Sequence, residues 1–237
     1  MKIEFIGKCL MIEEGGERNL IIGDLHLGYE EALNRGGVYV GRKMFDEYIS
    51  YLEMVFEKVG EIDRVILLGD VKHTFSENLR QEWNDVLELF DYFFSKKVKE
   101  IKIVRGNHDN YIKTIAGRRD VEVMDFLILK EFAFIHGDKD FEEINGKDIK
   151  YWVLGHGHPA VKLRDGVKTE KYKCYLIGKY KNKKIIIMPS FFEYNEGSDP
   201  RENDYNMPWN FNFDKFDVKV VGEDLDVMDF GKLSKVS

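Results

Sequence analysis

Aspartate, asparagine and histidine side chains recur in five short blocks along this 237-residue chain, and all six histidines lie in them. Each block directly follows an apolar run, which places it where a predicted strand ends. Together these side chains offer hard oxygen and imidazole donors, which suit divalent metal ions. The five blocks are Gly23-Asp24-Leu25-His26, Gly69-Asp70-Val71-Lys72-His73, Gly106-Asn107-His108-Asp109, His136-Gly137-Asp138 and Gly155-His156-Gly157-His158.

The candidate ligands are more than one ion can take. In an extended segment, residues i and i+2 point the same way, so Asp24 with His26, and His156 with His158, are expected to converge. Two divalent ions about 3.5–4 Å apart, with one bridging carboxylate, would use the whole set, and such a pair clamps the attacking and leaving oxygens in phosphoryl hydrolysis. The candidate metal ligands are Asp24, His26, Asp70, Asn107, His136, His156 and His158.

The donor types narrow the choice of metal. Imidazole-rich ligation favours manganese, and iron, zinc, cobalt, nickel and magnesium remain candidates because availability decides among them. The only cysteines, Cys9 and Cys174, are far apart and outside any Cys-x-x-Cys spacing. A disulfide framework or a thiolate zinc site is therefore not expected.

The segments between the blocks predict an α/β fold. Apolar positions three and four residues apart predict helices over residues 42–59 and 79–94. With continuous apolar strands at 19–22, 65–68 and 101–104, they give a strand-helix alternation that indicates crossovers and a largely parallel sheet. From residue 121 strand follows strand, which predicts a second, mainly antiparallel sheet packed on the first. We therefore expect two packed mixed sheets flanked by helices, a four-layer α/β/β/α sandwich, in one domain over residues 1–237. The strands expected after residue 120 are 121–124, 126–129, 132–135, 151–154, 161–163, 173–177 and 185–188.

The order of the blocks resembles that of the calcineurin-like metallophosphoesterase superfamily over residues 23–158. This resemblance implies a metal-dependent hydrolase of phosphoric esters. By it, Asp70 would bridge the two ions. The first ion would be held by Asp24, His26 and His158, and the second by Asn107, His136 and His156.

The same resemblance assigns roles to two residues outside the ligand set. His108 would stabilise the phosphoryl transition state or protonate the leaving oxygen, a role that suits imidazole because its pKa lies near neutral pH. Asp109 resembles the carboxylate that orients this histidine in the family. Both are expected to be catalytic.

One position departs from the common family pattern. His73 stands where many members carry Asp or Asn. This form, with Trp83 and Arg105 nearby in sequence, resembles a branch of small prokaryotic phosphoesterases that includes the DNA-ligase-associated enzymes. His73 is expected either to support a ligand by hydrogen bonding or to contact substrate, and Lys72 and Arg105 are further candidates for such contacts.

Charge is distributed unevenly along the chain. The formal net charge is -7. Residues 162–184 carry nine Lys or Arg against Asp165 and Glu170, which makes this segment +7 and leaves -14 elsewhere. The segment could be a patch for an anionic ligand or a set of hairpin edges guarded by lysine. The acidic and aromatic stretch 189–209 reads as a long loop, either functional or a stabilising extension.

These features favour a two-metal enzyme that hydrolyses phosphodiester bonds of nucleotides or nucleic acid. The reaction would be in-line attack by a water or hydroxide bridging the ions. A phosphomonoesterase or nucleotide hydrolase would use the same ligands. An inactive protein-binding scaffold and a non-hydrolytic metal-binding regulator are alternatives of other classes. No apolar run approaches the roughly 20 residues of a membrane span, so we expect a cytoplasmic protein without a membrane partner. Protein partners and oligomeric state stay open.

Overall fold

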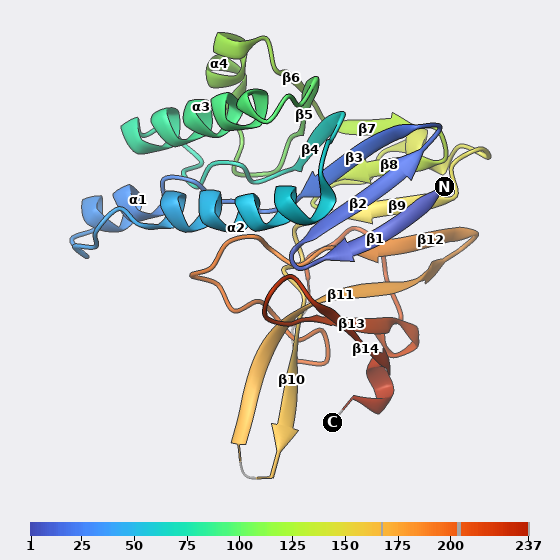
Figure 1. The fold of residues 1–237 in the computed structure, drawn as a ribbon. Helices are drawn as coiled ribbons and strands as arrows, with labels where there is room; N and C mark the ends of the chain where they lie inside the picture. Colours follow the sequence, from blue (N-terminus) through green and yellow to red (C-terminus); the bar gives the residue numbers. More distant parts are fainter. Residues whose placement is uncertain (167, 203–204, 237) are drawn as a thin grey trace.

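The computed structural model describes residues 1–166, 168–202 and 205–236. Two β-sheets face one another, and Figure 1 shows the α-helices gathered on the outer side of one of them. None of the helices in the described part of the chain has the length and apolar character needed to cross a membrane. The α-helices are α1 (Tyr29–Arg35), α2 (Met44–Val59), α3 (Arg80–Ser95) and α4 (Ile112–Ala116).

The first sheet has the order β1-β2-β3-β4-β5-β6. Its strands β3, β4, β5 and β6 are parallel, as the strand-helix alternation predicted, whereas β1, β2 and β3 form an antiparallel meander. Because parallel strands end at the same edge, the segments that follow β3, β4 and β5 meet there. The strands are β1 (Lys2–Ile6), β2 (Cys9–Glu14), β3 (Glu17–Ile22), β4 (Arg64–Leu68), β5 (Glu100–Val104) and β6 (Glu122–Met124).

The second sheet has the order β14-β13-β11-β12-β9-β8-β7, and β10 pairs with β11. It is mainly antiparallel, with β9 parallel to both β8 and β12. The strands are β7 (Phe126–Leu129), β8 (Phe132–Ile135), β9 (Tyr151–Leu154), β10 (Ala160–Asp165), β11 (Lys168–Tyr180), β12 (Lys183–Ile187), β13 (Asp217–Val221) and β14 (Val227–Lys232).

One strand lies in the first sheet, although it was predicted in the second. The segment 121–124 was expected in the second sheet, but β6 pairs with β5 in parallel, and this prediction was wrong. The connection between them contains only the five-residue α4 and the 3-10 helix η1 (Gly117–Arg119). So short a helix leaves too few turns for a periodic apolar stripe, so the crossover could not be read from the sequence.

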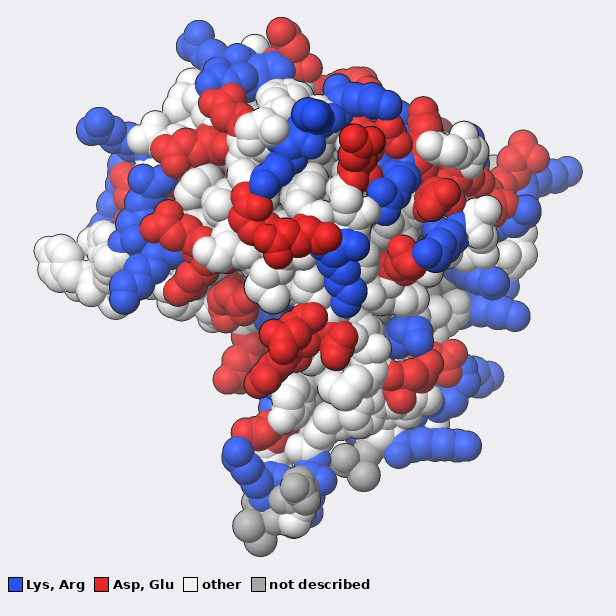
Figure 2. Space-filling model, viewed as in Figure 1, with Lys and Arg blue, Asp and Glu red and all other residues white. Residues whose placement is uncertain are grey.

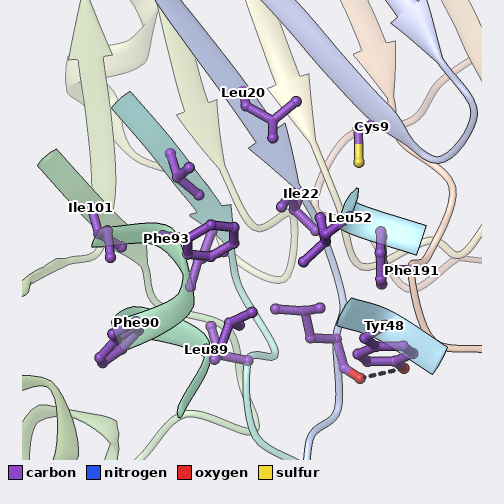
Figure 3. Packing of buried hydrophobic residues seen from close by; sticks show 14 of the residues in the cluster. Cys9, Leu20, Ile22, Tyr48, Leu52, Leu89, Phe90, Phe93, Ile101 and Phe191 are labelled. Atoms are coloured by element: carbon purple, nitrogen blue, oxygen red, sulfur yellow. Dashed lines mark hydrogen bonds between the residues drawn. The ribbon is translucent and has the colours of Figure 1, made fainter. Parts of the chain in front are cut away.

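Alternate residues of the first sheet pack against different layers. Leu20 and Ile22 of β3 lie in the core beneath the helices, whereas Ile21 lies in the core between the sheets. Figure 3 shows the helix side, where Tyr48 of α2 belongs to the same core as Leu20 and Ile22. The Tyr48 hydroxyl donates a hydrogen bond to the carbonyl of Leu25, 2.9 Å away. This buried contact ties α2 to the segment that follows β3.

The outer face of the second sheet is covered differently. Trp152 and Ile185 pack there against Trp209, Phe211 and Phe216 from the chain after β12. The layer that covers this face consists of coil and short 3-10 helices. The predicted fold class, two mixed sheets with flanking helices, is confirmed. The 3-10 helices of this half are η2 (Glu142–Asn145), η3 (Phe213–Lys215) and η4 (Leu233–Lys235).

The basic segment 162–184 does not form one continuous patch. Figure 1 shows β10 and the start of β11 projecting as a hairpin from the body. On it, Lys162 forms an ion pair with Glu202 at 2.6 Å. The Nζ of Lys183, whose side chain is buried, donates to the carbonyls of Gly146 and Ile149. Figure 2 shows acidic and basic side chains interspersed over the viewed face. Of the two interpretations of this segment, the arrangement favours lysines that protect exposed strand edges over a binding patch for an anionic ligand.

Candidate metal centre at the strand ends

The predicted ligands come together at the carboxyl ends of five strands. Asp24 follows β3, Asp70 follows β4, Asn107 follows β5, His136 follows β8 and His156 follows β9. Six of the ligands form two groups in which the ligand atoms lie within 4.8 Å of one another. We call Asp24, His26 and His158 the first group, and Asp70, His136 and His156 the second group. The Oδ1 atom of Asn107 lies 3.1 Å from Nε2 of His136, beside the second group.

The ligands converge through left-handed backbone rather than through extended segments. The φ angles are +53° at Asp24, +49° at His26 and +47° at Asp70. His156 and His158 also have positive φ, of +63° and +43°. Few non-glycine residues adopt this conformation, and it is concentrated at functional sites where the surrounding structure holds it. Asp24 and His26 meet in the first group as expected, whereas His156 and His158, also expected to converge, lie in different groups. The extended backbone from which both pairs were predicted was wrong.

Hydrogen bonds between neighbouring loops hold this backbone in place. The N–H of Asp24 donates to the carbonyl of Gly69 at 3.1 Å, and the N–H of His26 donates to that of Asp70 at 2.8 Å. The segments after β3 and β4 therefore continue side by side beyond the sheet. This pairing places the two aspartates next to one another.

Two glycines leave the space that the ligands occupy. At Gly69, where φ is +80°, an added Cβ would lie 2.2 Å from Nδ1 of His136. At Gly106 an added Cβ would lie 2.2 Å from Oδ1 of Asp70 and 2.3 Å from its backbone nitrogen. Any side chain at either position would displace a ligand. Close packing against the candidate ligands therefore accounts for glycine at both positions.

The second group is organised by hydrogen bonds within the protein. Nδ1 of His136 donates to the carbonyl of Leu68 at 3.2 Å, which directs Nε2 toward the other ligands. This Nε2 lies 3.4 Å from Oδ2 of Asp70 and 3.2 Å from Nδ1 of His156. Burial alone would lower the pKa of His136, but the carboxylates of Asp70 and Asp24 outweigh it and raise the pKa to about 10. Without another cation, this imidazolium supplies the positive charge that the buried carboxylates need.

The first group contains polar atoms that the protein leaves without partners. Oδ2 of Asp24 and both ring nitrogens of His26 are buried and have no hydrogen-bond partner among the described residues. Burial lowers the pKa of His26 to about 3, against the opposing charge of Asp70, so its ring is neutral. A carboxylate oxygen and neutral imidazole nitrogens are the ligand forms that divalent ions bind. These residues therefore fit a divalent ion on chemical grounds.

A loop residue that the sequence did not single out completes the first group. Nδ1 of His158 lies 3.1 Å from Nδ2 of Asn195, and Nε2 of His158 lies 3.2 Å from Oδ1 of Asp24. Asn195 belongs to the stretch 189–209, which was recognised only as a long loop. The backbone N–H groups of Phe191 and Phe192 fix this loop by donating to the carbonyls of Gly23 and Asp24. An amide in an aperiodic loop gives no local signal of such a contact.

His108 lies beside Asp70. Its backbone N–H donates to Oδ1 of Asp70 at 2.9 Å, and its ring Nε2 lies 4.0 Å from Oδ2 of Asp70. The expectation that Asp109 orients the His108 ring is not met. Asp109 accepts the backbone N–H groups of Gly106 at 2.9 Å and Lys72 at 3.2 Å. Instead, Nδ1 of His108 donates to the carbonyl of His73.

The three candidates for substrate or supporting contacts lie in different surroundings. The His73 ring lies 5.5 Å from the rings of both His26 and His108, centroid to centroid. Its Nδ1 is buried without a hydrogen-bond partner among the described residues. The guanidinium of Arg105 lies against Asp125, with 2.5 Å between Nη2 and Oδ1. His73 therefore adjoins the first group, whereas Arg105 is engaged elsewhere and its contact with substrate stays a prediction.

Lys72 supports a loop instead of reaching the site. Its side chain is fully buried, and Nζ lies 3.7 Å from Oε2 of Glu82, which is also fully buried. The same Nζ donates to the carbonyls of Thr74 and Glu77. A substrate contact for Lys72 does not fit this arrangement, because every direction around Nζ is filled by the protein's own acceptors. Its partner Glu82 was not recognised from the sequence, where it is one acidic residue of a helix.

The comparisons with known proteins agree with this geometry. The calcineurin-like phosphoesterase family matches residues 18–227, and the chain belongs to this family. No curated protein matches the chain. Among solved structures, the nuclease MPE of Pseudomonas putida has a TM-score of 0.62 and 16% identity, over 94% of this chain and 100% of that one. Vacuolar protein sorting 29 of Cryptosporidium parvum has a TM-score of 0.42 and 16% identity, over 96% and 100%. The likeness to the nuclease shows a shared fold, and the family predicted from the five blocks is confirmed.

Proposed function

We propose that this protein is a two-metal phosphodiesterase that acts on nucleotides or nucleic acid. The observation that carries the proposal is that Asp70, a member of the second group, also faces the first group. Its Oδ2 lies 3.7 Å from Nε2 of His26 and 3.4 Å from Nε2 of His136. One carboxylate thus faces imidazoles of both groups, as a ligand shared by two ions must.

The remaining ligands divide between the two sides of Asp70. Asp24, His26 and His158 would hold one ion, and His136, His156 and Asn107 the other. When bound, two divalent ions supply the positive charge that activates water and neutralises phosphate oxygens. Manganese is the first choice for this mixture of imidazole and oxygen donors, and iron, zinc, cobalt, nickel or magnesium would also fit.

The chain's own residues then position the chemistry. The carbonyl of His73 holds the proton on Nδ1 of His108, which leaves Nε2 turned to the side of Asp70. A protonated Nε2 at this place would donate to a phosphate oxygen or to the departing oxygen. Asp109 supports this by joining the segments that carry Lys72 and Gly106, so that His108 keeps its distance from Asp70.

Two further observations support the proposal, the first for an active enzyme and the second for a nucleic acid as the substrate. All the predicted ligands are present and assembled, which an inactive scaffold would not require. The solved structure of the Pseudomonas putida protein with the same fold is a nuclease.

The test is hydrolysis of chromogenic esters by metal-stripped protein. Bis-p-nitrophenyl phosphate and p-nitrophenyl phosphate would be compared with and without added manganese, and Asp70→Asn is the control variant. We expect manganese-dependent cleavage of the diester that is lost in Asp70→Asn. Cleavage of the monoester alone would replace the proposal by a phosphomonoesterase, and no turnover of either ester by metal-loaded protein would contradict it.

A further inference from the structure

Five aromatic rings form a continuous row along the candidate centre. The ring of Tyr194 lies 5.5 Å from that of Tyr29, which lies 4.9 Å from the ring of His73, centroid to centroid. The His73 ring lies 5.5 Å from that of His108, and the His108 ring lies 3.7 Å from that of Phe75. The two histidines of the row, His73 and His108, adjoin the candidate ligand His26. The row therefore passes the place where the reacting phosphate would lie.

The two ends of the row are open to solvent. Phe75 and Tyr194 are each 48% exposed, whereas the ligands His26 and Asp70 are buried. Phe75 comes from the segment between β4 and α3, and Tyr194 from the long loop after β12. Two unrelated segments thus each place an exposed ring at an end of the same row. Isolated exposed aromatics need no explanation, but two that flank one site offer flat apolar surfaces to a ligand.

The charges around the row argue against recognition through a long phosphate backbone. Proteins that bind along a phosphate backbone contact it with lysine and arginine side chains that are not paired with acidic residues. Two arginines of this half of the molecule are already engaged in ion pairs. Arg105 pairs with Asp125, and Arg35 lies 3.1 Å from Glu31 and 3.2 Å from Glu77. Base stacking and the ion-bound phosphate would therefore supply affinity that these two arginines do not.

We propose that the row binds the unpaired nucleobases on either side of the scissile phosphate, which makes single-stranded nucleic acid the preferred substrate. This inference rests on the proposed phosphodiesterase function and specifies its substrate. Stacking on aromatic side chains tolerates every base, because each base has a π-face. A base paired within a duplex has both faces covered by its neighbours, so the row selects against duplexes.

The test compares two metal-dependent reactions of the same protein. One substrate is a short thymidine oligonucleotide, and the other is the same oligonucleotide with abasic residues on both sides of a central phosphate. We expect the ratio of their kcat/KM values to favour the intact strand by about five-fold or more, since stacking of one base contributes at least about that much. Duplex DNA should be cleaved more slowly than the single strand.

Variants at the exposed ends separate stacking from catalysis. Phe75→Leu and Tyr194→Leu should each lower the ratio toward one, and Phe75→Tyr should keep it because a flat ring remains. Phe230→Leu is the matched control, since Phe230 is 41% exposed on β14 and outside the row. An unchanged ratio in both leucine variants overturns the inference, and so does equal cleavage of the two strands by wild-type protein.

A binding measurement keeps the inference testable without turnover. Fluorescence anisotropy of the same two strands with wild-type protein in the presence of a chelator, which prevents turnover, should show tighter binding of the intact strand. If no ester is cleaved but this difference is present, the proposed function fails and the base-binding row stands. If diesters are cleaved and no difference appears, the row fails and the phosphodiesterase stands.

Discussion

The two ligand groups differ in what holds them together. In the second group, His136 is fixed by the Leu68 carbonyl and lies within hydrogen-bond distance of Asn107 and His156. In the first group, His26 has no hydrogen-bond partner for either ring nitrogen among the described residues. The protein therefore assembles the second group by itself but leaves the first group dependent on a ligand. A buried polar group without a partner costs about 1–3 kcal/mol, so of the two groups it is the first that carries this cost in the metal-free protein.

The largest effect is expected where the two groups meet. Asp70→Asn removes the negative charge that faces both groups, so diester hydrolysis should fall by about 10³-fold or more, the scale of losing charge stabilisation in a buried site. Initial rates with saturating manganese measure this. Asp125→Asn is the control, because Asp125 contacts Arg105 instead of a ligand. A loss of less than ten-fold in Asp70→Asn would show that the two groups work separately.

A substitution at His108 should affect turnover without affecting metal binding. It belongs to neither group, so His108→Ala should bind metal like the wild type while turnover falls by about 10²-fold or more on esters with poor leaving groups. The loss should be smaller for p-nitrophenyl esters, whose leaving group needs no proton. Metal content by mass spectrometry and kcat on both kinds of ester measure this. Equal rates for variant and wild type would remove His108 from the mechanism.

The support of the first group comes from one loop side chain. Asn195→Ala removes the contact to Nδ1 of His158, and loss of such an orienting contact lowers metal affinity by about 10–100-fold. We expect the loss in only one of two metal-binding steps measured by calorimetry. Asn210→Ala, on the outer covering layer, should leave both steps unchanged. Equal weakening of the two steps would contradict the division into groups.

The difference between the groups should also appear in metal-free stability. His26→Leu removes nitrogens that have no partners, so it should leave the free energy of unfolding unchanged or raise it by up to about 1 kcal/mol. His136→Leu removes a hydrogen-bond partner from Leu68, Asn107 and Asp70, so it should lower the free energy of unfolding by about 1–3 kcal/mol. Urea unfolding in the presence of a chelator compares them. Equal destabilisation by both variants would contradict the difference between the two groups.

The smallest effect is expected in the basic segment. Lys179 is exposed near the end of β11, and Lys181 lies in the turn between β11 and β12. Reversing both charges should change diester hydrolysis by less than about two-fold, because exposed charges are screened by salt. Lys171 and Lys173 are left in place, since both donate to backbone carbonyls of the loop that carries Asn195. A ten-fold loss on DNA would make the segment part of substrate binding.

Local patterns in the sequence were enough to predict the strand ends that carry the ligands. The apolar runs before Asp24, Asp70 and His136 are strands, and the side chains after them converge. Three features depend on contacts distant in sequence and were missed: the sheet to which β6 belongs, the support from Asn195, and the bond from the Lys72 backbone to Asp109. The left-handed φ angles of the ligands were also missed, because non-glycine residues rarely adopt them without support from the rest of the fold.

The most direct test of a two-metal centre is a titration of manganese into metal-free protein while diester hydrolysis and bound metal are measured together. If the two groups each hold an ion and share Asp70, activity should stay near the background at one bound ion per chain and rise as the second binds. Full activity with one bound ion per chain, or none with two, would contradict the proposed centre.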